Sequence, residues 1–169
     1  MDHAFIISEL TRNKEVFAQL LGHKAEAAIR WKPAADQWCL LEIVCHLLDE
    51  EREDFRARIQ HLFEHPDTAP PSFDPLLWVT ERKYMEQDYE AKVEAFLQER
   101  EQSVQWLQSL ENPAWTNSYE HPQGGRPDAE HFLANWLGHD YLHIRQISRI
   151  NYRYLQEHTH NPLRYAGNW

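Results

Sequence analysis

The sequence has few of the residues that mark fibrous, secreted or membrane-spanning proteins. It contains 2 cysteines, 5 glycines and 9 prolines in 169 residues, too little glycine and proline for a collagen-like or linker-like chain. No run approaches the ~18 consecutive apolar residues of a transmembrane helix. The first residues lack the basic and apolar regions of a secretion signal. We therefore expect a cytoplasmic protein with one globular domain over residues 1–169.

The chain is also short of positive charge. It has 17 Lys and Arg against 27 Asp and Glu, a formal net charge of −10 at pH 7. Such a protein repels the phosphates of nucleic acids and of anionic membrane surfaces. We expect no nucleic-acid partner and no membrane partner. The two cysteines, Cys39 and Cys45, point to different faces of one expected helix, so we expect no disulfide between them.

Apolar residues recur at steps of three and four residues in four long segments, which is typical of amphipathic helices. These segments are residues 2–28, 40–64, 80–110 and 128–155. Proline-containing stretches at 31–33, 65–71 and 112–113 separate them, and residues 115–127 are expected to form a loop. We also expect a short turn or helix around 74–80.

The absence of strand-like alternation predicts an all-α protein, and four long helices predict a four-helix bundle. Asp128 is a suitable N-cap for the fourth helix. The connections between helices one and two and between helices three and four are long, so we expect a crossover at one of them. The tail after Thr159 has no helical period, and Trp169 either packs on the domain or extends from it.

Histidine is abundant, at 11 residues in 169, and neutral imidazole is a common ligand of zinc, nickel, iron and copper. His139 and His143 lie one turn apart on the expected fourth helix, so both rings can reach one ion. They fall within the apolar stripe of that helix, where ring nitrogens need partners. From these residues alone, two interpretations remain open. The histidines are either a pair of metal ligands or two core residues satisfied by hydrogen bonds.

Other histidines are harder to interpret. His61 and His65 form a second pair, but they lie at the end of the second helix and are expected to face solvent. A zinc-protease motif requires Glu directly after the first histidine, and Asp140 stands there instead. His46 lies away from the centre of the apolar stripe of its helix, so periodicity alone favours a surface position.

Three stretches together resemble the DinB/YfiT-like family of metalloenzymes. They are Gln37-Trp38-Cys39 followed by His46-Leu47-Leu48-Asp49-Glu50, the loop 115–125 with His121-Pro122-Gln123-Gly124, and Gly138-His139-Asp140-Tyr141-Leu142-His143-Ile144-Arg145-Gln146-Ile147. The resemblance spans almost the whole chain, and its first and third stretches are the most specific. It implies a four-helix bundle that is often a homodimer, with one metal histidine from helix two and two from helix four.

Applied to this sequence, the resemblance implies that His46, His139 and His143 bind a divalent zinc, nickel or iron ion. Three protein ligands leave positions open for water or substrate. Such an ion activates a bound water or thiol. The resemblance therefore implies hydrolysis or thiol S-transfer on a small molecule, with a low-molecular-weight thiol as one candidate substrate. The alternative is a non-catalytic binding or dimerisation module that holds a structural or adventitious ion.

Several further residues are candidates for the site. Glu50, and after it Asp49, are candidate proton-transfer groups, although both also suit a solvated acidic face. Gln146 is a candidate for orienting a ligand ring. Trp136 and Phe132 are expected to pack in the core. The alternative is that they line a substrate pocket. Cys39 stands where many relatives have Ser; because Cys is a poorer N-cap, we expect Asp36 or water to cap the second helix. A reactive Cys39 thiol is the less favoured hypothesis.

Overall fold

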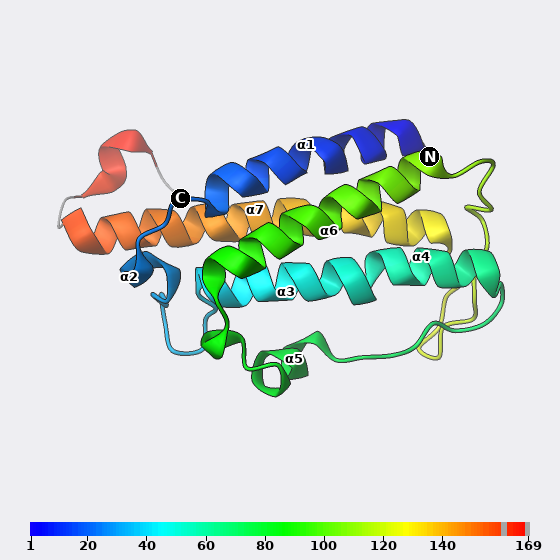
Figure 1. Cartoon of the computed structure of the whole chain (residues 1–169), viewed down its shortest axis with the longest axis horizontal. Coiled ribbons are helices and arrows are strands. Elements are labelled where there is room, and N and C mark those ends of the chain that lie inside the picture. Colours follow the sequence, from blue (N-terminus) through cyan, green and yellow to red (C-terminus); the bar gives the residue numbers. More distant parts are fainter. Residues whose placement is uncertain (160–161, 168–169) are drawn as a thin grey trace.

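The computed structural model describes residues 1–159 and 162–167 and consists of helices (Figure 1). The long helical elements are α1 (His3–Leu21), α3 (Leu40–Glu53), α4 (Phe55–Glu64), α6 (Tyr89–Ser109) and α7 (Ala129–Thr159). The short ones are α2 (Glu26–Ile29), α5 (Pro75–Glu81), η1 (Tyr84–Glu86) and η2 (Leu163–Ala166). The described residues form no strand beyond one isolated bridge between Ser118 and Asp128. The predicted all-α four-helix bundle is confirmed.

The order of the helices around the bundle differs from their order in the sequence. α1 packs against α6 and α7, and the α3–α4 pair packs against the same two helices. Figure 1 shows α1 and α7 running in one direction and α3, α4 and α6 in the other. Because α4 and α6 are parallel, the chain between them must return along the bundle.

This return is the long crossover, and it lies between α4 and α6. It comprises residues 65–88, which we call the crossover segment, and it contains α5 and η1. The expectation of a crossover at one of the other two connections is therefore wrong. Residues 80–88 continue the apolar spacing of the third predicted helix but belong to the connection, which makes this connection longer than the sequence pattern predicts. Lys83 adopts a left-handed conformation (φ 50°), and Asp88 caps a helix that begins at Tyr89.

Other helix boundaries follow local chemistry. α1 ends at Leu21, earlier than predicted, and His23 just beyond it has a left-handed backbone (φ 55°). Asp54 interrupts the predicted second helix. The Asp128 carboxylate accepts a hydrogen bond from the His131 N–H at 2.8 Å, as expected of an N-cap. α7 continues past the predicted end at residue 155. Trp169 lies outside the described residues.

α3 is the central helix of the molecule. Every residue from Leu40 to Glu51 is buried. α6 and α7 contact one side of α3, and α5 and η1 of the crossover segment also pack on it. The crossover segment therefore covers a side of α3 that the sequence pattern assigned to solvent. Polar side chains of α3 are enclosed as a result, and each needs a partner in the protein or a ligand.

Candidate metal centre

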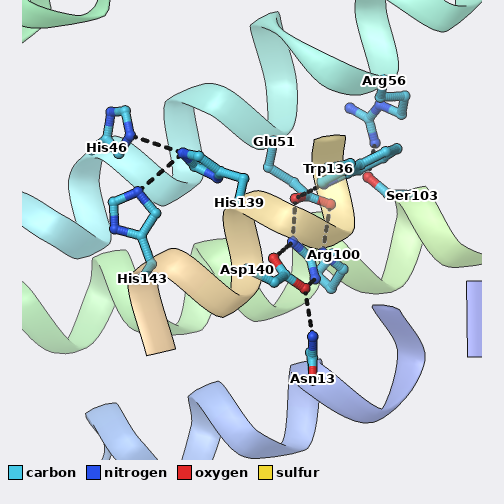
Figure 2. Close-up of polar contacts among 10 residues, drawn as sticks. All are labelled: Asn13, His46, Glu51, Arg56, Arg100, Ser103, Trp136, His139, Asp140 and His143. Carbon is cyan, nitrogen blue, oxygen red and sulfur yellow. Dashed lines mark hydrogen bonds and ion pairs between the residues drawn. The ribbon is translucent and has the colours of Figure 1, made fainter. Parts of the chain in front are cut away.

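The rings of His46, His139 and His143 converge, and we call these residues the three-histidine centre (Figure 2). Nε2 of His139 lies 3.3 Å from Nε2 of His46 and 3.0 Å from Nε2 of His143. Nitrogen ligands ~2.0–2.1 Å from a tetrahedral zinc ion stand about 3.3 Å apart. The observed separations fit a shared ion. Within the described ranges, no other group of three His, Cys, Asp or Glu residues has this arrangement.

Aromatic side chains hold two of the rings in place. The Trp38 ring packs on His46 with 4.8 Å between centroids, and the Phe55 ring packs on His139 with 5.2 Å. Trp38 directly precedes Cys39, the N-cap of α3. Its ring covers the ring of His46, which lies farther along the same helix. The Trp–His spacing in the sequence therefore has a packing role at the centre.

The three rings are neutral at physiological pH. His46 and His143 are buried and His139 is half-buried. Burial, followed by the neighbouring His143, lowers the pKa of His46 to about 3. Burial also lowers the pKa of His139 to about 2, with further contributions from the two other histidines and Arg100. It lowers the pKa of His143 to about 4. Neutral imidazole is the form that binds metals.

The buried nitrogens that face away from the centre do not fit the alternative of hydrogen-bonded core histidines. Nδ1 of His46 and Nδ1 of His143 have no hydrogen-bond partner within the described part of the chain. Core histidines satisfied by hydrogen bonds would have carbonyl or carboxylate partners at these atoms. Here the rings contact one another through Nε2 instead. The residues present fit a metal ion better than they fit the core alternative.

Glu50 adjoins the centre, whereas Asp49 does not. Oε1 of Glu50 lies 3.8 Å from Nδ1 of His46. Burial raises the pKa of the Glu50 carboxyl to about 8, and Asp54 adds to the effect. The Asp49 carboxylate is turned to the crossover segment, where it accepts a hydrogen bond from the Tyr84 hydroxyl at 2.6 Å. Of the two carboxyl groups, Glu50 alone lies beside a histidine of the centre.

Gln146 and the two aromatic candidates occupy different environments. Burial lowers the pKa of His143, and the polar side chain of Gln146 raises it in part. Nδ1 of His143 has no hydrogen-bond partner among the described residues. Trp136 is buried in the core and donates its Nε1–H to Glu51 at 3.0 Å. Phe132 is half-buried and lines a cavity described below.

A buried ionic network that the sequence pattern did not predict lies beside the centre (Figure 2). Arg100 of α6 donates two hydrogen bonds of 2.8 Å to Glu51 of α3 and two of 2.7 Å to Asp140 of α7. Asn13 of α1 donates to Asp140 at 3.1 Å. Burial alone would lower the pKa of Arg100, but the two carboxylates raise it above its usual range.

The network joins all four long helices of the bundle. A signal for it exists in the sequence, because Arg100 continues the apolar spacing of its helix set by Val93, Phe96, Val104 and Leu107. A charged residue within such a stripe indicates a buried ion pair.

Residues 9–147 match the model of the DinB superfamily. The chain belongs to the DinB superfamily. The structure of this DinB protein is similar to that of YfiT from Bacillus subtilis, described as "a probable metal-dependent hydrolase with an unusual four-helix bundle topology". The TM-score is 0.79 at 16% identity, covering 89% of this chain and 86% of that chain, which shows a common fold. No curated protein matches the sequence.

Two cavities reach the centre of this DinB protein, and they share no lining residue. The first, the His46 cavity, has a volume of about 550 Å³. Its walls include His46, His143, Trp38, Leu76, Gln146 and Arg149. The second, the His139 cavity, has a volume of about 620 Å³. Its walls include His139, Phe55, Arg58, Phe132 and Leu142. A ligand in either cavity lies beside at least one of the three histidines.

The remaining histidine candidates lie outside the centre. Nε2 of His61 lies 3.0 Å from the carbonyl oxygen of Thr68, and His65 is exposed. This agrees with the expectation that the pair faces away from the core. His121, in the middle stretch of the family resemblance, accepts a hydrogen bond from the Gln123 N–H within its own loop. None of these three belongs to the three-histidine cluster.

Cys39 has a structural position at the start of α3. It is itself the N-cap, and its N–H donates to the Glu42 carboxylate at 2.9 Å in a capping box. Of the two caps expected for this helix, Asp36 and water, Asp36 is excluded, because it is exposed and does not occupy the N-cap position. Cys39 and Cys45 are both buried and free. Burial raises the pKa of the Cys39 thiol and raises that of Cys45 to about 12, so neither suits a reactive thiolate.

Proposed function

We propose that this DinB protein is a metal-dependent enzyme whose divalent ion, zinc, nickel or iron, is held by His46, His139 and His143. The observation that carries the proposal is the convergence of three neutral histidine rings, with Nε2 separations of 3.0 and 3.3 Å. Three histidines without a fourth protein ligand are typical of catalytic sites rather than structural ones.

A divalent ion held in this way lowers the pKa of a coordinated water or thiol toward neutrality. The protein supplies the remaining functions. Trp38 and Phe55 fix two of the rings and shield them from water. Glu50, with a pKa raised to about 8, holds a proton close to physiological pH and exchanges it beside the centre. Gln146 contributes a polar side chain to the cavity wall next to His143.

Two reactions suit this arrangement, and the cavities favour the one with two substrates. The His46 and His139 cavities give separate places beside the histidines for a low-molecular-weight thiol and for a small electrophile. S-transfer from the thiol to the electrophile is therefore our first proposal. Hydrolysis is the second, and it is supported by the description of YfiT as a probable metal-dependent hydrolase.

The proposal is tested on untagged protein loaded with cobalt(II), whose absorption spectrum reports its ligands. We expect 2-mercaptoethanol to produce a thiolate-to-cobalt absorption band, and the zinc form to catalyse its reaction with 1-chloro-2,4-dinitrobenzene. Hydrolysis of p-nitrophenyl acetate tests the second reaction. His46→Ala should abolish the thiolate-to-cobalt band and the catalysed reaction, whereas the matched control His61→Ala should keep the band and the activity. A bound ion that takes no thiol and supports neither reaction would favour the non-catalytic binding module.

A further inference from the structure

The His46 cavity carries two arginines on one wall. Arg149 and Arg153 lie one turn apart on α7, and both line the cavity that His46 and His143 face. They follow Gln146 along the same helix. The protein as a whole has a formal net charge of −10, so a pair of neighbouring cations at the mouth of a cavity stands out from the surrounding surface.

Neither arginine forms an ion pair with a carboxylate of the residues that the structure describes. Arg149 is exposed and forms no hydrogen bond or ion pair with any described residue. Arg153 donates a hydrogen bond of 3.3 Å from Nη1 to the amide oxygen of Gln37, a neutral group. Asp36 also lines the cavity, but it forms no ion pair with either arginine in the described structure.

Most of the other arginines are paired with acids, although Arg145 is not, within the described part of the chain. Arg82 binds Glu53, and Arg126 binds Asp67 and Glu120, although all of these side chains lie at the surface. Acidic partners are therefore abundant on this protein, yet Asp36, the acid on the wall of the His46 cavity, pairs with neither arginine in the described structure. Two uncompensated guanidinium groups at a cavity form a binding site for an anion, because each presents a planar fork of N–H donors.

We propose that the His46 cavity binds a small-molecule substrate by a carboxylate or phosphate group, held by Arg149 and Arg153. This inference rests on the proposed function, since it defines which substrate reaches the three-histidine centre. Arg149 follows His143 by six residues, roughly 9 Å along the helix. The reacting end of the substrate therefore lies roughly that far from its anionic group. Gln146 lies between the two ends, and Trp38 and Leu76 provide apolar walls.

The arginines act here as specificity-determining residues. The −10 net charge would repel an anionic ligand from most of the surface. Two guanidinium groups at one cavity reverse this locally and orient the ligand with its uncharged end toward His46 and His143. A neutral analogue of the same shape would lose these contacts and bind more weakly.

The test compares Arg149→Gln, Arg153→Gln and the double variant with Arg145→Gln. Arg145 is exposed on the same helix but does not line the cavity, so the control removes the same charge one turn away. Succinate and inorganic phosphate are titrated into the zinc-loaded proteins by calorimetry. We expect the wild type to bind at least one of them, and which one binds identifies the anionic group. The double variant should bind at least about tenfold more weakly, as expected for lost hydrogen bonds between charged groups, and the control should bind like the wild type.

The metal content of every sample is measured first, and the titrations are repeated on metal-free protein. Anion binding that depends on the two arginines in metal-free protein supports the cavity assignment even if no ion is ever bound, in which case only the proposed function fails. The proposal is overturned if the wild type binds neither probe at millimolar concentration. It is also overturned if the double variant and Arg145→Gln bind equally well, because the probe would then be held by the metal or by general charge.

Discussion

The carboxylate of Asp140 accepts two hydrogen bonds of 2.7 Å from the guanidinium of Arg100, beside the three-histidine centre (Figure 2). Asp140 directly follows the first histidine of the α7 pair, the position of the general base in zinc proteases. In this protein it fixes α7 to α6, and through Arg100 to Glu51 of α3. The helices that carry the ligand histidines are thus joined at a buried ionic contact.

Removal of Arg100 should destabilise the fold strongly. Arg100→Met leaves Glu51 and Asp140 buried without a counter-charge, and breaking such a buried pair costs about 3–5 kcal/mol. Urea unfolding followed by circular dichroism measures the loss. Arg126→Met, which removes only exposed pairs, should leave the free energy of unfolding almost unchanged. Similar losses in the two variants would contradict this account of the network.

The metal-free protein should lose stability in mild acid. The folded pKa values of His46, His139 and His143 are lowered from 6.5 to about 3, 2 and 4. Because protons then bind the unfolded chain more tightly, stability is complete above pH 6.5 and falls as the pH drops below it. We expect a loss of about 1 kcal/mol per histidine between pH 7 and pH 5.5. Urea unfolding in EDTA measures it, and an equally steep loss in the triple alanine variant would refute the assignment.

Glu50→Gln should separate metal binding from proton transfer. The ligands are unchanged, so the variant should keep its ion, but it loses the group whose pKa is raised to about 8. The turnover number for the reaction of 2-mercaptoethanol with 1-chloro-2,4-dinitrobenzene should fall by about 10²-fold or more. The change in this turnover number near pH 8 should disappear from its pH profile. Glu64→Gln, at an exposed position, is the matched control. A Glu50→Gln variant with wild-type turnover and an unaltered pH profile would exclude Glu50 from the reaction.

The cysteines should be unreactive in the native protein. Cys39 and Cys45 are buried, and burial raises the pKa of both thiols. Ellman's reagent should label almost no thiol in buffer and both thiols in urea. Rapid labelling of one thiol in the folded protein would restore the hypothesis of a reactive Cys39.

The fold and part of the site could be predicted from residues alone. The spacing of His139 and His143 within an apolar stripe placed both rings on the inner face of α7, because that helix has one buried side. His46 was different, since Trp38 and the two α7 histidines bury its ring on a side of α3 that periodicity assigns to solvent. The family resemblance, rather than the helical pattern, identified His46.

Other features depend on tertiary contacts that a one-dimensional pattern does not contain. The burial of Glu50 and the double pairing of Arg100 require three helices to be placed together. No helix in the described ranges is long and apolar enough to cross a membrane, in agreement with the sequence. The cytoplasmic location and the homodimer stay predictions, and light scattering on the purified protein tests the latter.

Metal content is the most direct test of the three-histidine centre. Untagged protein, purified without nickel resin, is analysed by plasma mass spectrometry beside the triple His46→Ala, His139→Ala, His143→Ala variant. A double His61→Ala, His65→Ala variant is the control. We predict about one divalent ion per chain in the wild type and control, and none in the triple variant while it remains helical. A wild type that binds no ion even after zinc or nickel is supplied, or a triple variant that holds as much as the wild type, would contradict the account.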